Sequence, residues 1–231
     1  MSWSEQPLVG FDTETTGVDP QSSRLVTAAI IVREDGADRK RTWLANPGVE
    51  IPVAASQVHG VTTEYARAHG ADPKQVLEEV ASLLTAHLLA GHPVVAFNAK
   101  YDLELMEAEL TRHGLPTLTQ RLGRLLPVID PLVLDRALDR WRKGKRTLSD
   151  VAALYGVRVP GEAHNADVDV LLALGVAQEI ARRYPNIAQL SALELHHFQV
   201  DAYRDWAQGF IQFRRHSNPQ FTMSTKWPLQ D

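Results

Sequence analysis

An apolar strand that ends in two carboxylates constrains this chain more than any other part of its sequence. Residues 9–18 read VGFDTETTGV, so the apolar run leads directly into Asp12 and Glu14. Side chains two apart on a strand leave the same face, where like charges repel and are costly to bury. A bound divalent cation resolves that conflict, and Mg²⁺ and Mn²⁺ prefer such oxygen ligands. A strand running out into a solvated acidic turn explains this segment equally well on its own.

The composition is that of an ordinary globular protein and excludes several kinds of site. The chain has 231 residues, 44% hydrophobic and 23% charged, and it contains no cysteine. Disulfides, thiolate metal sites and cysteine nucleophiles are therefore excluded. There is no apolar run of membrane-spanning length and no secretion signal, so we expect a cytoplasmic protein with no membrane partner. Because the net charge is −4, a nucleic-acid partner would need bound metal or a local basic patch.

The pattern of apolar residues and turn signals predicts a mixed α/β fold. Residues 24–34 and 39–45 read as strands joined by a hairpin turn at Asp35-Gly36, and an irregular stretch then runs to Gly60. We expect helices over 62–69, 74–89, 99–113, 132–141, 147–155, 167–184 and 192–215, and strands over 93–97 and 125–129. This order favours a mixed sheet, antiparallel at first and then parallel, with helices on both faces.

The domain organisation follows from the same pattern. We expect one domain over residues 1–185 and a C-terminal helical extension and tail over residues 186–231, to which the sequence assigns no function. No internal repeat and no clear linker interrupts the chain.

A second segment supplies a carboxylate where a metal site would need one. Residues 94–102 read VVAFNAKYD, so a strand should end near Asn98 and place Asp102 in the first turn of the next helix. Ligands bind at the C-terminal ends of strands in open α/β sheets. A favourable charge at a helix N-terminus is the alternative explanation of Asp102.

A third segment, HNADVD, runs from His164 to Asp169 after a Pro-Gly turn signal. Five residues apart, these two side chains cannot share one face of a helix, so His164 must lie in the loop if both act at one site. Asp167 and Asp169 point to different sides of the helix, and Asp169 shares its face with apolar Leu172 and Val176. Charge at a helix start explains both acids equally well on its own.

Taken together, the three segments resemble the DnaQ-like, DEDDh-type 3′–5′ exonucleases of the ribonuclease H-like fold. The resemblance covers residues 8–183 and rests on Asp12, Glu14, Asp102, His164 and Asp169 in this order and context. The motif FDTETTG matches the family pattern closely, whereas FNAKYD has phenylalanine where many members have histidine. The segment QVHGVT, residues 57–62, also resembles a family segment near the terminal nucleotide of the substrate.

The resemblance implies a role for each of these residues. All five would be catalytic: Asp12, Glu14, Asp102 and Asp169 would bind two Mg²⁺ or Mn²⁺ ions, and His164 would be the general base. It also implies substrate contacts, which we expect at Thr15, Thr16, His59 and Asn98.

The expected activity is hydrolysis from the 3′ end of single-stranded DNA, with release of nucleoside 5′-monophosphates. We expect DNA to be favoured over RNA, and a DNA polymerase is a candidate partner in replication or repair. The same five residues would also serve a ribonuclease that trims RNA or short oligoribonucleotides, or a hydrolase of small phosphodiesters. A non-catalytic module that binds nucleic acid or a polymerase is a further alternative, but it would have no need of four converging carboxylates.

One basic run stands out in this acidic protein. Residues 136–146 carry six basic side chains and one acid. A solvated helix end and loop is the simplest explanation of such a run. The net charge favours a second interpretation, in which the run guides the phosphate backbone of a bound strand.

Overall fold

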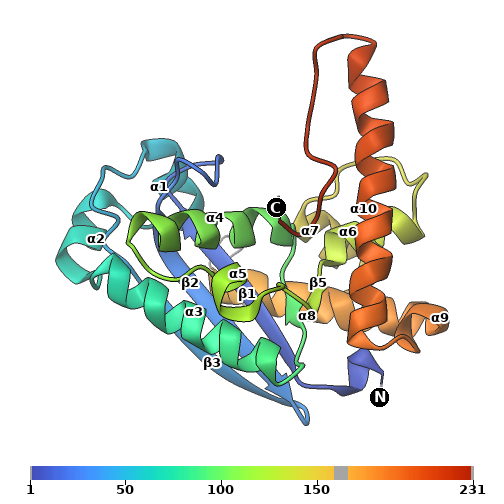
Figure 1. The fold of residues 1–231 in the computed structure, drawn as a ribbon, viewed down its shortest axis with the longest axis horizontal. Helices are drawn as coiled ribbons and strands as arrows, with labels where there is room; N and C mark the ends of the chain where they lie inside the picture. The colour runs from blue at the N-terminus through green and yellow to red at the C-terminus, as the bar shows by residue number, and fades with distance from the viewer. Residues whose placement is uncertain (1, 159–165, 230–231) are drawn as a thin grey trace.

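A five-stranded mixed sheet forms the centre of the protein (Figure 1). The computed structural model describes residues 2–158 and 166–229. The strands are β1 (Leu8–Thr15), β2 (Leu25–Glu34), β3 (Ala37–Leu44), β4 (Val94–Val95) and β5 (Val128–Ile129), in the spatial order β3-β2-β1-β4-β5. β1 pairs with β2 and β2 with β3 in antiparallel fashion, whereas β1-β4 and β4-β5 are parallel. The predicted mixed sheet is therefore confirmed.

The helices follow the predicted order with three additions. They are α1 (Val53–His59), α2 (Thr63–His69), α3 (Pro73–Leu89), α4 (Ala99–Arg112), α5 (Leu118–Leu122), α6 (Pro131–Leu138), α7 (Leu148–Tyr155), α8 (Ala166–Arg183), α9 (Pro185–Ala188) and α10 (Ala192–Arg215). The prediction of an irregular stretch before Gly60 was wrong at α1, and α5 and α9 were missed. These helices have at most seven residues, too few for a helical period to show in the sequence. No described helix is long and apolar enough to cross a membrane.

The hairpin between β2 and β3 has the turn that its sequence predicts. Asp35 and Gly36 have φ angles of 51° and 77°, and Glu34 pairs with Ala37 across them. Positive φ at both central residues is typical of the tight turn whose twist matches that of the flanking strands.

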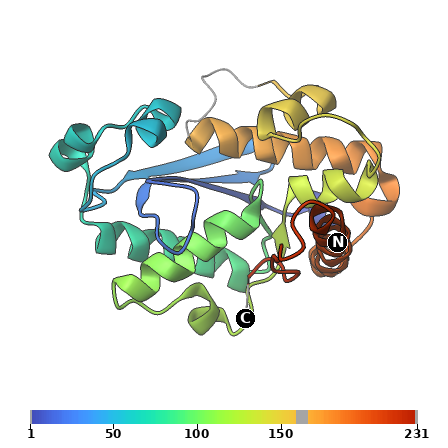
Figure 2. The same ribbon diagram turned by 90° about the horizontal axis from the view of Figure 1, so that it is seen from above.

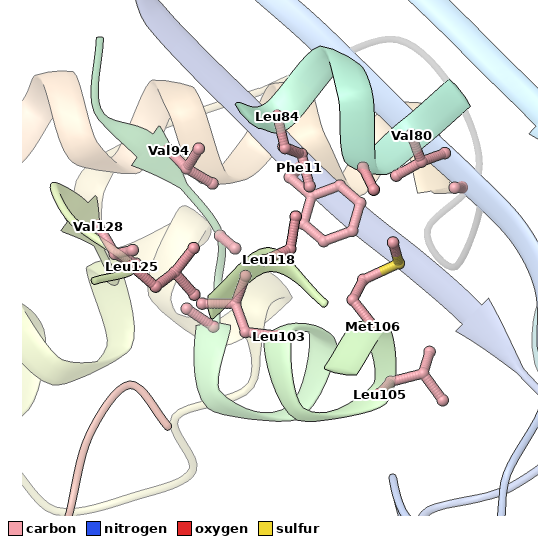
Figure 3. Packing of buried hydrophobic residues seen from close by; sticks show 14 of the residues in the cluster. Phe11, Val80, Leu84, Val94, Leu103, Leu105, Met106, Leu118, Leu125 and Val128 are labelled. Carbon is pink, nitrogen blue, oxygen red and sulfur yellow. The ribbon is translucent and has the colours of Figure 1, made fainter. Parts of the chain in front are cut away.

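The sheet separates two hydrophobic layers, and strand β1 contributes alternate residues to each. Val9 and Phe11 face α3 and α4, where Phe11 packs among Leu84, Leu103 and Met106 (Figure 3). Leu8 lies in the opposite layer, which α7 and α8 cover. Figure 2 shows the sheet between these two sets of helices. By the alternation of a strand, Asp12 and Glu14 follow Leu8 and Gly10 towards α8.

Helix α8 lies unusually close to β1 because Gly10 has no side chain. A Cβ atom at Gly10 would lie 2.5 Å from Val170 Cγ1 and 2.8 Å from Leu174 Cδ1. Glycine therefore sets the distance between the strand that carries Asp12 and the helix that carries Asp169.

Helix α10 covers the open edge of the sheet at β5. Val128 donates its backbone N–H to His196 Nδ1 at 3.2 Å. Gln199 accepts from the Asp130 backbone N–H at 2.6 Å and donates to the Val128 carbonyl at 3.0 Å. The tail returns to place the Trp227 ring 5.2 Å from that of His196. Residues from the predicted extension, 186–231, therefore satisfy the backbone groups of an edge strand.

We expect Gly10→Ala to lower the free energy of unfolding by about 1–3 kcal/mol, the usual penalty of overpacking a filled interior. Urea denaturation of the metal-free protein measures this. Gly209→Ala is the matched control, because no atom lies within 4 Å of a Cβ at that position in α10. That control should be neutral or stabilising by up to about 1 kcal/mol, since alanine favours a helix. A Gly10→Ala protein as stable as the wild type would contradict the close approach of α8.

Candidate active site

Three carboxylates from two elements converge at the C-terminal end of β1. Asp12 and Glu14 project from β1 towards α8, and Asp169 lies in the first turn of that helix. One oxygen from each of the three lies within 4.8 Å of the others. All three side chains are partly buried. The structure thus brings together residues that are more than 150 positions apart in the sequence.

Asp102 reaches the same end of the sheet from the other layer, on α4. Its Oδ1 accepts two hydrogen bonds from Thr13, at 3.1 Å from the backbone N–H and 2.6 Å from the hydroxyl. Thr13 lies between Asp12 and Glu14 in β1 and therefore points to the opposite face. Asp102 does not join the three-oxygen cluster, but its charge is the next cause, after burial, of the raised pKa of Asp12.

The electrostatics of these groups show how unfavourable their charges are together. Burial, followed by repulsion from Asp102, Glu14 and Asp169, raises the pKa of Asp12 well above its usual range. Burial, with the nearby charges of Asp169 and Asp102, raises the pKa of Glu14 to about 8. Burial likewise raises the pKa of Asp102 to about 7, although its hydrogen bonds from Thr13 act in the opposite direction.

The donor set fits a divalent cation. Carboxylate oxygens are hard ligands of the kind that Mg²⁺ and Mn²⁺ take, and a cation between them would reverse the repulsion that raises their pKa values. Asp12, Glu14 and Asp169 are the residues that could hold it. Asp102 is placed to add a further negative charge beside them.

Asp167, the other acid of the third motif, lies outside this cluster. Its Oδ2 accepts a hydrogen bond from Lys40 Nζ on β3 at 2.6 Å. The sequence predicts that Asp167 and Asp169 lie on different sides of the helix. The structure agrees, because Asp169 joins the carboxylate cluster and Asp167 pairs with Lys40. His164, predicted as the general base, lies outside the described residues.

Three of the four predicted substrate residues lie in or beside the turn that follows β1. The hydroxyl of Thr15 donates to the Gly17 carbonyl at 2.7 Å, and that of Thr16 accepts from the Arg24 backbone N–H at 2.9 Å. The backbone of Thr15 lies beside the imidazole of His59, whose pKa burial lowers. The two threonine side chains therefore hold the turn. The backbone N–H of Thr16 also donates to the Arg24 carbonyl at 3.0 Å, and the Gly17 carbonyl accepts from Tyr101 as well.

Two further features of the predicted substrate residues bear on binding. Nε2 of His59 is buried without a hydrogen-bond partner among the described residues. Asn98 is exposed and has a left-handed backbone, with φ 62° and ψ 41°, at the start of α4. The exposed amide of Asn98 is available to a ligand, whereas Nε2 of His59 is covered by the protein.

Sequence reasoning missed three residues that position this site. Thr13 fixes Asp102, and the Tyr101 hydroxyl is 2.6 Å from the hydroxyl of Thr15. Asp130 accepts hydrogen bonds at 2.9 and 3.0 Å from the backbone N–H groups of Asn98 and Ala99, which start α4. Strand alternation could have identified Thr13. Nothing in the local sequence connects Asp130 to a segment 31 residues earlier.

The basic run at 136–146 is only partly available as a guide for phosphates. Arg142 and Arg146 both pair with Asp135, which is fully buried. The guanidinium carbon of Arg136 lies 3.9 Å from the centre of the Trp206 ring. The charged groups of these three residues are therefore engaged with Asp135 or Trp206, and the predicted guide is left with Arg140, Lys143 and Lys145.

Comparison with known proteins places the chain in a family. The family model RNase_T, described as Exonuclease, matches residues 9–177. The chain belongs to this family, the DnaQ-like 3′–5′ exonucleases. The matched residues include the four carboxylates that the structure places at the end of β1.

Relatives of this exonuclease include parts of much longer proteins. The PolC-type DNA polymerase III of Streptococcus pneumoniae serotype 2 is 28% identical over 211 residues, which cover 88% of this chain and 13% of the polymerase. That of Streptococcus mutans is 31% identical over 140 residues, covering 60% of this chain and 9% of the polymerase. The exonuclease chain thus spans a small part of the relatives that it matches.

Solved structures share the fold of this exonuclease. The zinc-bound complex of Escherichia coli exonuclease I with single-stranded DNA has a TM-score of 0.69 at 19% identity, covering 86% of this chain and 43% of that one. Exonuclease X in complex with 5′-overhanging duplex DNA has a TM-score of 0.57 at 22% identity, covering 82% of this chain and 99% of that one. Both neighbours carry the ribonuclease H-like arrangement of sheet and helices.

We expect Mn²⁺ to raise the thermal midpoint of the exonuclease, and by more at pH 8 than at pH 6. A carboxyl with a raised pKa contributes stability while it is protonated, and this contribution is lost as pH rises from about 4, the ordinary pKa, to about 8, the pKa of Glu14 in the folded protein. Protons compete with the ion at the lower pH, so the difference between Mn²⁺ and EDTA should grow with pH. Differential scanning fluorimetry measures this difference. Because the Mn²⁺ and EDTA samples are compared at the same pH, the titration of buried His196 affects both equally.

Two neighbouring substitutions make this test specific. Asp169→Asn should abolish the Mn²⁺-dependent rise and nearly all nuclease activity. Asp167→Asn should retain both and cost no more than an exposed ion pair, about 0–1 kcal/mol. If Asp167→Asn removed the rise and Asp169→Asn retained it, the metal site would be misassigned.

Proposed function

We propose that this exonuclease hydrolyses single-stranded DNA from the 3′ end and releases nucleoside 5′-monophosphates, using Mg²⁺ or Mn²⁺. The observation that carries the proposal is the convergence of Asp12, Glu14 and Asp169 within 4.8 Å at the end of β1, with Asp102 beside them. A DNA substrate is supported by the neighbours: exonuclease I and exonuclease X were both solved with DNA. The PolC-type relatives support a DNA polymerase as a candidate partner.

Two ions in the site are consistent with the number of carboxylates. In this proposal Asp12, Glu14 and Asp169 bind the cations, and Asp102 adds its charge directly or through water. Such ions, when bound, would favour ionisation of the attacking water and would neutralise charge on the phosphate and leaving oxygen.

The remaining steps fall to residues of the chain. His164 takes a proton from the attacking water, a role that suits an imidazole because its ordinary pKa of about 6.5 is near neutral. The backbone around Thr15 and the imidazole of His59, which lie against each other, position the terminal nucleotide. Asn98, exposed at the start of α4, contacts the substrate from the side of β4.

The decisive experiment is digestion of end-labelled single strands. DNA and RNA of matched sequence, labelled at the 5′ or the 3′ end, are incubated with Mg²⁺, Mn²⁺ or EDTA, and Asp12→Ala serves as the inactive control. We expect shortening from the 3′ end of DNA, dependence on either metal, and mononucleotide products. Faster digestion of RNA would assign the protein to RNA trimming instead. Equal cleavage of linear and circular DNA, or full activity of Asp12→Ala, would overturn the proposal.

For the proposed base, we expect His164→Ala to lower turnover by roughly 10²–10⁴-fold, the usual contribution of general acid–base catalysis. Strand binding in EDTA should be unchanged, because the imidazole acts on water. His216→Ala, at the exposed end of α10, is the matched histidine control. Turnover of His164→Ala near that of the wild type at neutral pH would remove His164 from the mechanism.

A further inference from the structure

A groove outside the carboxylate site runs between the α6–α7 connection and α10. Its volume is about 800 Å³. One wall carries Arg136, Arg140 and Trp141, and the other carries Trp206 and Phe210. We call this hollow the α6–α10 groove. It contains none of the carboxylates described above.

The groove offers aromatic faces for stacking. The Trp206 and Phe210 rings are nearly parallel, with an interplanar angle of 15° and centroids 5.5 Å apart, and the guanidinium carbon of Arg136 lies 3.9 Å from the centre of the Trp206 ring. Trp206 is therefore already stacked within the protein. Trp141 on the opposite wall is 84% exposed. A tryptophan so exposed gains nothing from the protein core, and it presents a face on which a nucleobase can stack.

The charges of the groove are divided between its two walls. Arg140 lines the groove, and Lys143 and Lys145 follow it on the same α6–α7 connection. All three are exposed, and none is ion-paired with a described residue within 4.0 Å. Asp201 and Asp205 lie on the α10 wall. A phosphate backbone would therefore follow the connection, with its bases turned towards the aromatic side chains.

Helix α6 connects one wall of the groove to the end of β4. Helix α6 begins after Asp130, whose carboxylate accepts hydrogen bonds from the start of α4 at the end of β4. From there α6 runs for eight residues, about 12 Å, to the connection that forms the groove wall. The distal half of α10 projects from the body of the molecule beside it (Figure 1).

We propose that the α6–α10 groove is a second binding site for single-stranded nucleic acid, which holds the part of the strand upstream of its 3′ end. The inference rests on the proposed function, because it takes the strand's end to lie at Asp12 and Glu14. Its consequence is dependence on length: a long strand binds both sites, whereas a dinucleotide binds the carboxylate site alone.

The test compares groove variants on long and short substrates. Binding of a DNA strand of about 20 nucleotides, longer than the roughly 4–16 that one such site occupies, is measured by fluorescence anisotropy in EDTA over a range of salt. Trp141→Ala should weaken binding by about 5- to 150-fold, the loss of one base stack. Trp141→Phe should restore most of it. Hydrolysis of a dinucleotide should be unchanged in both.

A matched pair of triple variants separates local from overall charge. The groove variant carries Arg140→Ala, Lys143→Ala and Lys145→Ala, and the control carries Arg39→Ala, Lys74→Ala and Arg182→Ala, all exposed on other elements. The logarithm of the binding constant falls as the logarithm of the salt concentration rises. The magnitude of this slope should decrease by about 2 in the groove variant, at roughly 0.7 for each of three lost phosphate contacts, and by much less in the control.

The outcomes distinguish this inference from the proposed function. Long-strand binding equal to wild type in Trp141→Ala and in the groove triple variant would overturn the second site, and would leave the groove to a protein partner. The proposed function would still stand if these variants hydrolysed DNA. Equal losses of long-strand binding in the groove and control triple variants would also overturn the second binding site. If the wild type bound long DNA through the groove but hydrolysed neither substrate with Mn²⁺, the proposed function would fail and the binding site would remain.

Discussion

Mutual repulsion among four carboxylates is the constraint on which the rest of this structure depends. Asp12, Glu14 and Asp169 lie within a single ion's reach of one another, and Asp102 adds its charge from the other layer. Burial first, and then the charges of the neighbouring carboxylates, raises the pKa values of Asp12 and Glu14, so ionising both without a cation is unfavourable. Such a cluster persists only where the surrounding structure holds each side chain in place. The same repulsion that destabilises the metal-free protein favours binding of a divalent ion.

Strand β1 provides that scaffold because it lies between two hydrophobic layers. Its even-numbered residues face α8, and its odd-numbered residues face α3 and α4. Gly10 lets α8 approach, which brings Asp169 to Asp12, and Thr13 fastens Asp102 from the opposite face. A strand of eight residues thus sets the position of carboxylates on two helices that belong to different layers.

One part of helix α10 hydrogen-bonds to the edge of the sheet, and another part lines the groove. His196 and Gln199 satisfy backbone groups of β5 and of Asp130, and Asp130 in turn holds the start of α4. The helix is therefore connected through hydrogen bonds to the element that carries Asp102. Trp206 and Phe210, further along, line the α6–α10 groove. Residues beyond the family match at 9–177 thus support the element that carries Asp102 and line the groove.

The sequence by itself determined the order of the elements, the mixed sheet and the separation of Asp169 from Asp167. Those features follow from local rules: the period of two in β1, the period of 3.6 in α8 and the Asp35-Gly36 turn. The sequence could not predict α1, because seven residues carry too little periodicity. It also could not predict that Arg142 and Arg146 pair with Asp135, which removes two charges from an apparently exposed basic run. Tertiary structure decided these points, together with the support of α4 by Asp130 and of β5 by α10. The physical reason is that each depends on buried polar groups finding partners far away in the chain, and no local pattern encodes which partner is near enough.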